Sequence, residues 1–407
     1  MIISLGKAST LGAVTAMTHM FSRRGRIAVL AALCVTFGAA IGASRADAAG
    51  INAAFKGQAM WIWNMPQTEG GNVARIVARA KAAGVSAVYI KSADGSGAWR
   101  QFNRPLVNSL HAAGLRVCGW QFIYGVKPTG EARAAAAAKA AGADCMIIDA
   151  ESAYEGRYRS ARTYMKELRR LVGAKYPLGF TSFPYVDYHP SLPYSVFLGP
   201  GGAEVNMPQV YWRDIGDSVA ESMKHTWREN RIYGRPIHPI GQTYQSPSTN
   251  EILGFRRLAG AYKAPGYSWW EWSTTSAKLW RALGQKLPAA TTPADPGWPL
   301  LRKGSKGDPV VRAQQLLAAA GAAKLKATGI FDSATVAAVK AFQAKNRLTT
   351  DGQIGASTWK LLGKVTVALA RSRDAARAST ARQAAASADL PQSSSLPALK
   401  TELRGAR

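Results

Sequence analysis

Between residues 51 and 283 the sequence alternates short apolar runs with segments of helical periodicity. The apolar runs are expected to form eight strands: Ala59–Asn64, Ala87–Ser92, Arg116–Tyr124, Cys145–Glu151, Leu178–Ser182, Val205–Trp212, Ile237–Tyr244 and Tyr267–Trp272. The helical patterns lie between most of them: Val73–Ala83, Gln101–Ala113, Glu131–Ala141, Arg157–Val172, Ser218–Asn230 and Asn250–Ala261. Eight strands with intervening helices predict an α/β fold, a (β/α)8 TIM barrel. An open doubly wound sheet is the alternative, but no glycine-rich phosphate loop follows the first strand.

The remaining sequence divides into regions of different composition. We expect a signal peptide over residues 1–48, the barrel over 51–288, a proline-containing linker over 289–299, and a small all-α domain over 300–364. Residues 365–407 are rich in Ala, Ser and Arg and contain no aromatic residue, so they are expected to form a basic disordered tail.

The N-terminal region has the pattern of an export signal. Three arginines precede an apolar run, Ile27–Ile41, and Ala46-Asp47-Ala48 provides small residues for cleavage. The run is too short for a good membrane anchor, so no stable membrane insertion is expected after cleavage. The sequence therefore predicts a secreted protein of the periplasm or cell wall, and leaves Sec and Tat export both open.

The net charge of +28 favours an anionic partner. The positive charge is spread along the chain and forms no basic stripe with interleaved aromatic residues, so nucleic acid is not the expected partner. A polyanionic cell envelope accounts for the charge, and the sequence gives no oligomeric state.

Cysteine and histidine are few in the mature chain. Cys118 and Cys145 fall in neighbouring strands; two buried free thiols are the expectation, and a disulfide is the alternative in an oxidising compartment. No Cys or His spacing typical of a metal site occurs, so neither a metal nor another cofactor is expected.

The fourth predicted strand ends in two acidic residues. Side chains alternate along a strand, so Asp149 and Glu151 share a face while Ala150 points the other way. In a TIM barrel the reacting groups stand at the carboxyl ends of the strands. Two neighbouring carboxylates raise each other's proton affinity, which is what a glycosidase needs to keep one acid protonated at neutral pH.

This barrel resembles glycoside hydrolase family 25, the lysozyme-type muramidases, which carry Asp-x-Glu at the end of this strand. The likeness extends to Val88–Ser92, Ala112–Val117 and Gln209–Trp212. It implies that Glu151 is the general acid and that Asp149 orients the substrate through its acetamido group. The family usually has an acid on the first strand, where this chain has Trp61–Asn64.

A second carboxylate is expected from Glu271 on the eighth strand, which lies opposite the fourth strand in a closed ring. Asp214 is a weaker candidate. Several side chains near strand ends are expected to bind sugar, most of them by aromatic stacking: Trp63, Lys91, Tyr124, Tyr211, Trp212, Tyr244 and Trp269.

The C-terminal region contains two similar units, Gly329–Thr335 and Gly352–Thr358, each a turn followed by an amphipathic helix. With the helical stripe after Gly307, they resemble the three-helix bacterial peptidoglycan-binding domain. The residues expected to characterise this module are Phe331, Phe342, Gln343, Asp351, Thr358 and Trp359. The resemblance implies peptidoglycan as the partner.

Together these features indicate a secreted enzyme that cleaves peptidoglycan glycan strands, with its C-terminal module holding it on the polymer. The alternative is a non-catalytic wall-binding protein with a degenerate barrel, which the absent first-strand acid supports. A glycosidase that acts on another envelope polysaccharide is a third possibility.

Overall fold

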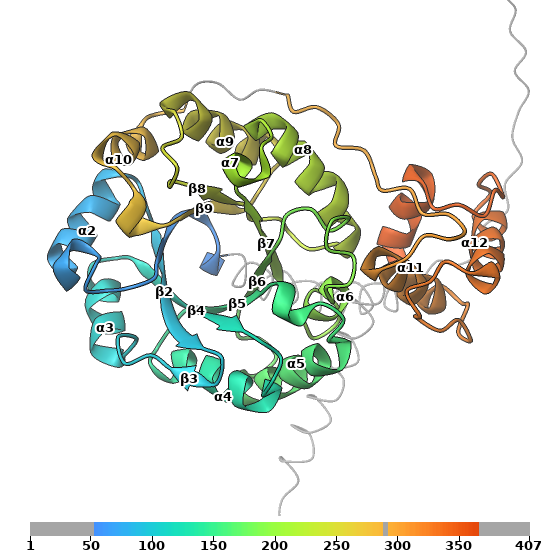
Figure 1. The fold of residues 1–407 in the computed structure, drawn as a ribbon, viewed down its shortest axis with the longest axis horizontal. Helices are drawn as coiled ribbons and strands as arrows, with labels where there is room; N and C mark the ends of the chain where they lie inside the picture. The colour runs from blue at the N-terminus through green and yellow to red at the C-terminus, as the bar shows by residue number, and fades with distance from the viewer. Residues whose placement is uncertain (1–52, 288–291, 366–407) are drawn as a thin grey trace, which may run out of the picture. The chain divides into compact units, whose positions relative to one another are not determined.

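The structure, a computed structural model, describes residues 53–287 and 292–365. Its strands are β1 (Gly57–Ile62), β2 (Ala87–Asp94), β3 (Gly97–Ala98), β4 (Arg116–Ile123), β5 (Cys145–Ala150), β6 (Leu178–Ser182), β7 (Val205–Val210), β8 (Ile240–Gln242) and β9 (Gly266–Trp270). All except β3 are parallel and form a closed ring, because β1 pairs with both β2 and β9. The predicted TIM barrel is confirmed, and Figure 1 shows the ring surrounded by helices.

The longer barrel helices are α2 (Val73–Ala82), α3 (Arg104–Ala112), α4 (Pro128–Ala140), α5 (Tyr158–Val172), α8 (Val219–Asn230), α9 (Thr249–Ala261) and α10 (Ala277–Gly284). The short helices α6 (Tyr194–Phe197) and α7 (Trp212–Ile215) follow β6 and β7. Most predicted boundaries hold within a few residues. The largest difference is the strand expected over Ile237–Tyr244, of which only β8 pairs regularly. Pro239 interrupts this segment and lacks the N–H that a ladder requires.

The strands separate two apolar cores. Side chains on their outer faces pack against the helices, and those on their inner faces fill the barrel. The inner core includes Trp61, Tyr89, Trp120, Ile147 and Met207, all buried. Alternation of side chains along each strand produces this division between the two cores.

Cys118 and Cys145 form a disulfide within the inner core. They are direct partners in the β4–β5 register, with their Cα atoms 4.6 Å apart. The expectation of two free thiols was therefore wrong, and the alternative holds. The strand register explains the difference because it places the two residues side by side, which sequence spacing does not show.

The C-terminal module contains α11 (Asp308–Ala319), α12 (Ser333–Lys345) and a helical stretch over residues 356–365. The Gln314 carboxamide accepts from the backbone N–H of Gly329 and donates to the Thr335 hydroxyl. The Gln343 carboxamide makes the equivalent bonds to Gly352 and Thr358. The two similar sequence units thus share one arrangement. In each, a buried glutamine on the preceding helix forms hydrogen bonds that hold the turn in place.

Asp308 joins this module to the barrel. Its carboxylate accepts hydrogen bonds from the Ser195 N–H at 2.8 Å and from the hydroxyls of Ser195, Tyr158 and Tyr233 at 2.6, 3.0 and 2.8 Å. Its own N–H donates to the carbonyl of Pro190 at 2.6 Å. A buried carboxylate with this many donors is held in one position, so the start of α11 is fixed on the barrel.

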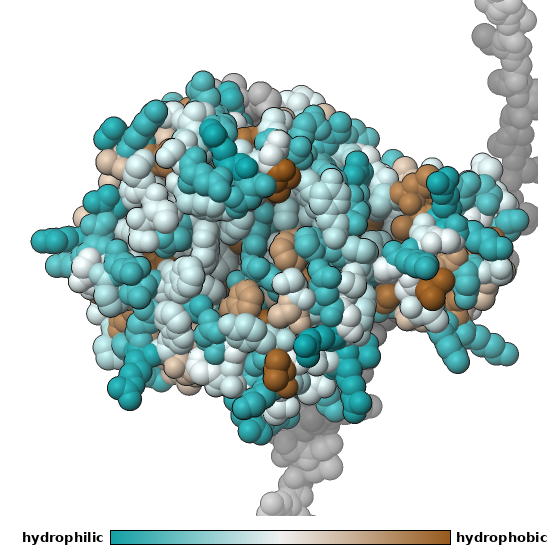
Figure 2. Space-filling view, viewed as in Figure 1, coloured by the Kyte–Doolittle hydropathy of each residue, from teal (hydrophilic) through white to brown (hydrophobic). Residues whose placement is uncertain are grey.

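The visible surface in Figure 2 is largely hydrophilic, with small scattered apolar spots. In the described ranges, no helix combines the length and apolar character needed to cross a membrane. The predicted signal peptide over 1–48 and the predicted tail beyond residue 365 lie outside the described residues.

Replacing both cysteines, Cys118→Ala with Cys145→Ala, is expected to lower the free energy of unfolding by about 3 kcal/mol. The bridge closes a loop with a sequence separation of 27 and so restricts the unfolded chain. Urea denaturation of the oxidised protein measures the loss, and the reduced wild type is the matched control. Equal midpoints for oxidised wild type and double variant would contradict the prediction.

Burial raises the pKa of Asp308 to about 6, although the hydrogen bonds it accepts oppose the shift. The pKa of Asp308 is therefore higher in the folded protein than in the unfolded chain. Its favourable contribution to the free energy of unfolding is complete below about pH 4 and is lost as the pH rises through about 6. We therefore expect the stability advantage of wild type over Asp308→Asn to shrink by about 2 kcal/mol between pH 4 and pH 7. Urea denaturation of both proteins across this range tests it; an advantage that grows with pH would refute it.

Candidate active site

Asp149 and Glu151 face the same cavity at the carboxyl end of the barrel. The cavity measures about 130 Å³ and is lined by Trp61, Asp149, Glu151, Thr181, Gln209, Tyr211, Ile240 and Trp270. Asp149 is the last inward-facing residue of β5, and Glu151 follows directly after the strand. Strand alternation therefore places both carboxyl groups at the barrel mouth, as the sequence predicted.

One amide group holds both acids. The side-chain nitrogen of Gln209, on β7, donates to Asp149 Oδ1 at 3.2 Å and to Glu151 Oε1 at 3.0 Å. An amide nitrogen has two hydrogens, so each carboxyl group receives one of them. Gln209 thereby fixes the separation of the pair while leaving their other oxygens free for further contacts.

The two acids differ in environment. Asp149 is buried, whereas Glu151 is partly exposed. Burial raises the pKa of Asp149 well above its usual range, the Glu151 charge raises it further, and the Lys91 charge opposes the shift. Asp149 thus favours its protonated, neutral form. As a carboxylic acid it has an O–H that can donate a hydrogen bond.

Lys91 lies beside the cavity in an aromatic cage. Its ammonium group is 5.1, 4.7 and 4.8 Å from the ring centroids of Trp63, Trp99 and Trp120. It also forms an ion pair with Asp94 at 2.6 Å. Lys91 is buried, so its positive charge acts on the site mainly through the electric field, which favours a negative charge on Asp149.

Glu271 does not line the cavity with Asp149 and Glu151. Its Oε1 accepts from the hydroxyl of Ser273 and from the N–H of Thr274 at 3.1 Å, which caps the short 3-10 helix Trp272–Thr274. The structure therefore gives Glu271 a local stabilising role. The expected position opposite Glu151 is taken by its neighbour Trp270, because the strand alternates at this point.

Four of the predicted sugar-binding aromatic residues lie at or near the barrel mouth. Trp63 and Tyr124 are exposed, and the Tyr124 hydroxyl donates to Asp94 at 2.8 Å. Tyr211 lines the cavity, and its ring packs edge-on against Tyr244, with centroids 5.6 Å apart. Asp214, the weaker acidic candidate, accepts from the Tyr244 hydroxyl.

Trp212 and Trp269 are corrections. Both are buried between the barrel and its helices, where each packs against Phe255. Trp269 points outward from β9, so it is Trp270 that faces the cavity. Trp212 begins helix α7 and turns its indole N–H toward Glu251 at 2.8 Å. Neither side chain is available to a sugar at the mouth.

The predicted site residues omit five that line the cavity: Trp61, Thr181, Gln209, Ile240 and Trp270. Thr181 is the register partner of Asp149, and its buried hydroxyl has no hydrogen-bond partner among the described residues. Strand alternation was the available signal, because Gln209 and Tyr211 share a face of the sixth barrel strand just as Asp149 and Glu151 share one of the fourth.

The residues predicted for the C-terminal module mostly form its interior. Five are buried, namely Phe331, Phe342, Gln343, Thr358 and Trp359. Asp351 is exposed and accepts from the Gln343 side chain at 2.7 Å. These side chains stabilise the fold of the module and present no stacking surface for a glycan.

Comparison with known proteins identifies this module. Residues 306–362 match the family described as "Putative peptidoglycan binding domain". No curated protein matches the chain by sequence.

Among solved structures, the spore cortex-lytic enzyme SleL of Bacillus cereus is similar with 10% identity and a TM-score of 0.45, over 56% of this chain and 73% of that chain. A chitinase from Chromobacterium violaceum has 10% identity and a TM-score of 0.39, over 57% of this chain and 100% of that one. A class V chitinase from Pseudomonas fluorescens has 11% identity and a TM-score of 0.42, over 56% and 98%. These values are too low to transfer an activity.

Gln209→Leu is expected to lower the free energy of unfolding by about 1–3 kcal/mol at pH 8 and by less at pH 4. The Gln209 amide donates to both carboxyl groups. Its bond to Asp149 stabilises the charged form of that group, which is the more populated at high pH. Urea denaturation at both pH values measures the difference. Gln285→Leu serves as a control because Gln285 lies far along the chain, after α10. An equal loss for Gln209→Leu at both pH values would contradict this interpretation.

Proposed function

We propose that this protein is an exported glycoside hydrolase that cleaves the glycan strands of peptidoglycan, held on its substrate by the C-terminal module. The observation that carries the proposal is the Asp149–Glu151 pair, bridged by Gln209 in an open cavity, on a chain that also has a peptidoglycan-binding module. The module supports the polymer as partner, and the acidic pair supports hydrolysis.

In the proposed reaction Glu151 gives its proton to the oxygen of the leaving sugar as the bond between that oxygen and the anomeric carbon breaks. A water molecule then adds to the anomeric carbon and returns a proton to Glu151. Glu151 is partly exposed and so can reach a bound glycan, whereas Asp149 is buried beneath it. Protonated Asp149 donates a hydrogen bond to an acetamido group and orients it, which is the role that the resemblance to family 25 implies. The unpartnered Thr181 hydroxyl offers a further contact at the same depth.

Export to an oxidising compartment agrees with the disulfide between Cys118 and Cys145, since such bridges persist outside the cytosol. It also agrees with the signal pattern at the N-terminus and with an envelope polymer as substrate. Both features support the proposal of an exported enzyme with access to peptidoglycan.

A binding-only protein is the second candidate, and two observations favour it. The cavity of about 130 Å³ is small, and the first strand has Trp61–Asn64 where the family usually has an acid. The Trp61 indole is committed to Ser268 Oγ at 2.9 Å and contributes no proton chemistry. In the binding-only function the barrel binds glycan without cleaving it.

Glu151→Gln is expected to reduce the release of fragments from purified sacculi by at least about 100-fold, because it removes the general acid. Binding to sacculi is expected to stay unchanged, since the module is not altered. Mass spectrometry of the released fragments gives both the rate and the bond cleaved.

The matched control is Glu155→Gln. Glu155 lies four residues further along the chain but pairs with His189, outside the cavity. If Glu151→Gln releases fragments at the wild-type rate, Glu151 is not the acid. If wild type binds sacculi and releases no fragment from pH 4 to pH 9, the binding-only function is correct.

A further inference from the structure

Three histidines in the described part of the barrel pair with carboxylates, and one of these pairs has an additional acidic neighbour. The pairs are His111 with Asp144, His189 with Glu155, and His225 with Asp187. At the third pair the carboxylate of Glu229 lies close enough to form a three-residue group with metal-ligand spacing. Within residues 53–287 and 292–365 this is the only such group. The group lies outside the cavity of Asp149 and Glu151.

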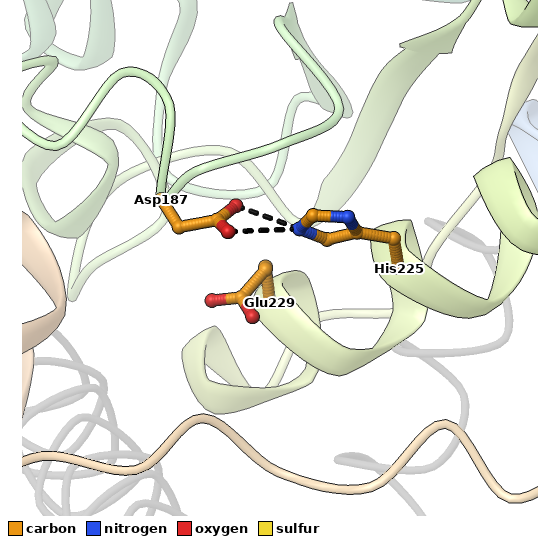
Figure 3. A group of neighbouring side chains, drawn as sticks. All are labelled: Asp187, His225 and Glu229. Carbon is orange, nitrogen blue, oxygen red and sulfur yellow. Dashed lines mark hydrogen bonds and ion pairs between the residues drawn. The ribbon is translucent and has the colours of Figure 1, made fainter. Parts of the chain in front are cut away.

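The three side chains converge from two elements. His225 and Glu229 lie one turn apart on α8, and Asp187 comes from the loop between β6 and α6. His225 Nε2 is 2.8 and 2.9 Å from the two carboxylate oxygens of Asp187. One ligand atom from each residue lies within 4.8 Å of the others. Figure 3 shows Asp187 and His225 pointing toward one another, with Glu229 beside them.

The imidazole of His225 is held in place by tyrosines. The ring of Tyr185 stacks on it at 3.7 Å with planes 13° apart, and the ring of Tyr188 meets it edge-on at 5.7 Å. The Tyr185 hydroxyl donates to Asp217 at 2.7 Å, which fixes that ring in turn. These contacts hold the imidazole in one rotamer, in which Nε2 faces the carboxylates, as in preorganised metal sites.

The charge of the group favours a cation. The Glu229 side chain is only 5% exposed, so its carboxyl group is held among protein groups. Arg228 contacts Glu229 at 2.7 Å and approaches Asp187 at 3.8 Å. This single guanidinium faces two carboxylates, and its side chain is 39% exposed, so it has solvent into which it can turn.

We propose that Asp187, His225 and Glu229 bind a divalent transition-metal cation of the Zn²⁺ type. One imidazole nitrogen with two carboxylate oxygens is a donor set that such cations accept, whereas Mg²⁺ and Ca²⁺ prefer oxygen ligands alone. Carboxylate and imidazole ligands of Zn²⁺ lie about 2.0–2.2 Å from the metal and so roughly 3.5 Å from one another. His225 Nε2 and Asp187 Oδ1, at 2.8 Å, need to separate slightly, and ligand atoms that lie up to 4.8 Å apart need to approach. A pocket of about 480 Å³ is lined by Asp187 and Glu229, and it gives water access to a fourth position.

The cation has a structural consequence. It ties the β6–α6 loop to α8, and this loop also carries Pro190, whose carbonyl accepts the Asp308 N–H from the C-terminal module. Metal binding therefore stabilises the barrel at the place where the module is anchored. This site is independent of the proposed glycan chemistry, because it shares no residue with the cavity of Asp149 and Glu151.

The test uses the full-length protein without a histidine tag, treated with chelator and titrated with Zn²⁺ at pH 7.5. Calorimetry is expected to give one site, and saturating Zn²⁺ to raise Tm by about 3 °C or more. Mg²⁺ and Ca²⁺ at equal concentration are expected to have no effect. The proposal is overturned if Zn²⁺ neither binds nor shifts Tm.

His225→Gln and Glu229→Gln are expected to weaken Zn²⁺ binding at least about 10-fold. His189→Gln is the matched control, since it removes a histidine from a carboxylate pair that has no third ligand. Arg228→Gln is expected to tighten binding, because it removes the competing cation, and this variant retains all three ligands. An equal loss for His189→Gln and His225→Gln, or weaker binding for Arg228→Gln, would overturn the proposal.

Discussion

Closure of the parallel strand ring is the constraint on which the rest of the structure depends. Once β1 pairs with both β2 and β9, every inward-facing side chain must fit a fixed interior. Aromatic and aliphatic side chains, among them Trp61, Tyr89 and Trp120, fill that interior together with the Cys118–Cys145 disulfide. At the carboxyl end of the strands the filling leaves a cavity of about 130 Å³, which is lined by Asp149 and Glu151. The candidate site is therefore a result of how the barrel is filled.

The two buried aspartates Asp308 and Asp149 differ in how many hydrogen bonds their carboxyl groups accept. Asp308 accepts hydrogen bonds from three side chains and one backbone N–H, so its oxygens are fully used in joining the module to the barrel. Asp149 receives a single amide hydrogen, from Gln209, and remains in contact with a cavity. Burial raises the pKa of both carboxyl groups. Only Asp149 keeps bonding capacity for a ligand, which is why the two have different proposed roles.

The sequence predicted the barrel well because strand and helix periods are local properties. The ends of β5 and the placement of Asp149 and Glu151 followed directly from alternation. The same rule was misapplied at β9, where Trp269 was expected at the mouth and Trp270 is found there. When both faces of a strand are buried, successive residues are all apolar, so the pattern does not show which of two adjacent side chains points into the barrel. A shift of one residue moves every side chain to the opposite face.

By itself the sequence determined the strand and helix order, the class of fold, the C-terminal module and the acidic pair, because each is encoded by short-range spacing. Tertiary structure alone decided the disulfide, the Gln209 bridge, the anchoring of Asp308, and the meeting of Asp187 with His225 and Glu229. Those contacts join residues that are distant along the chain. Their formation depends on strand register and on which helix face turns toward which loop, and neither is set by local sequence.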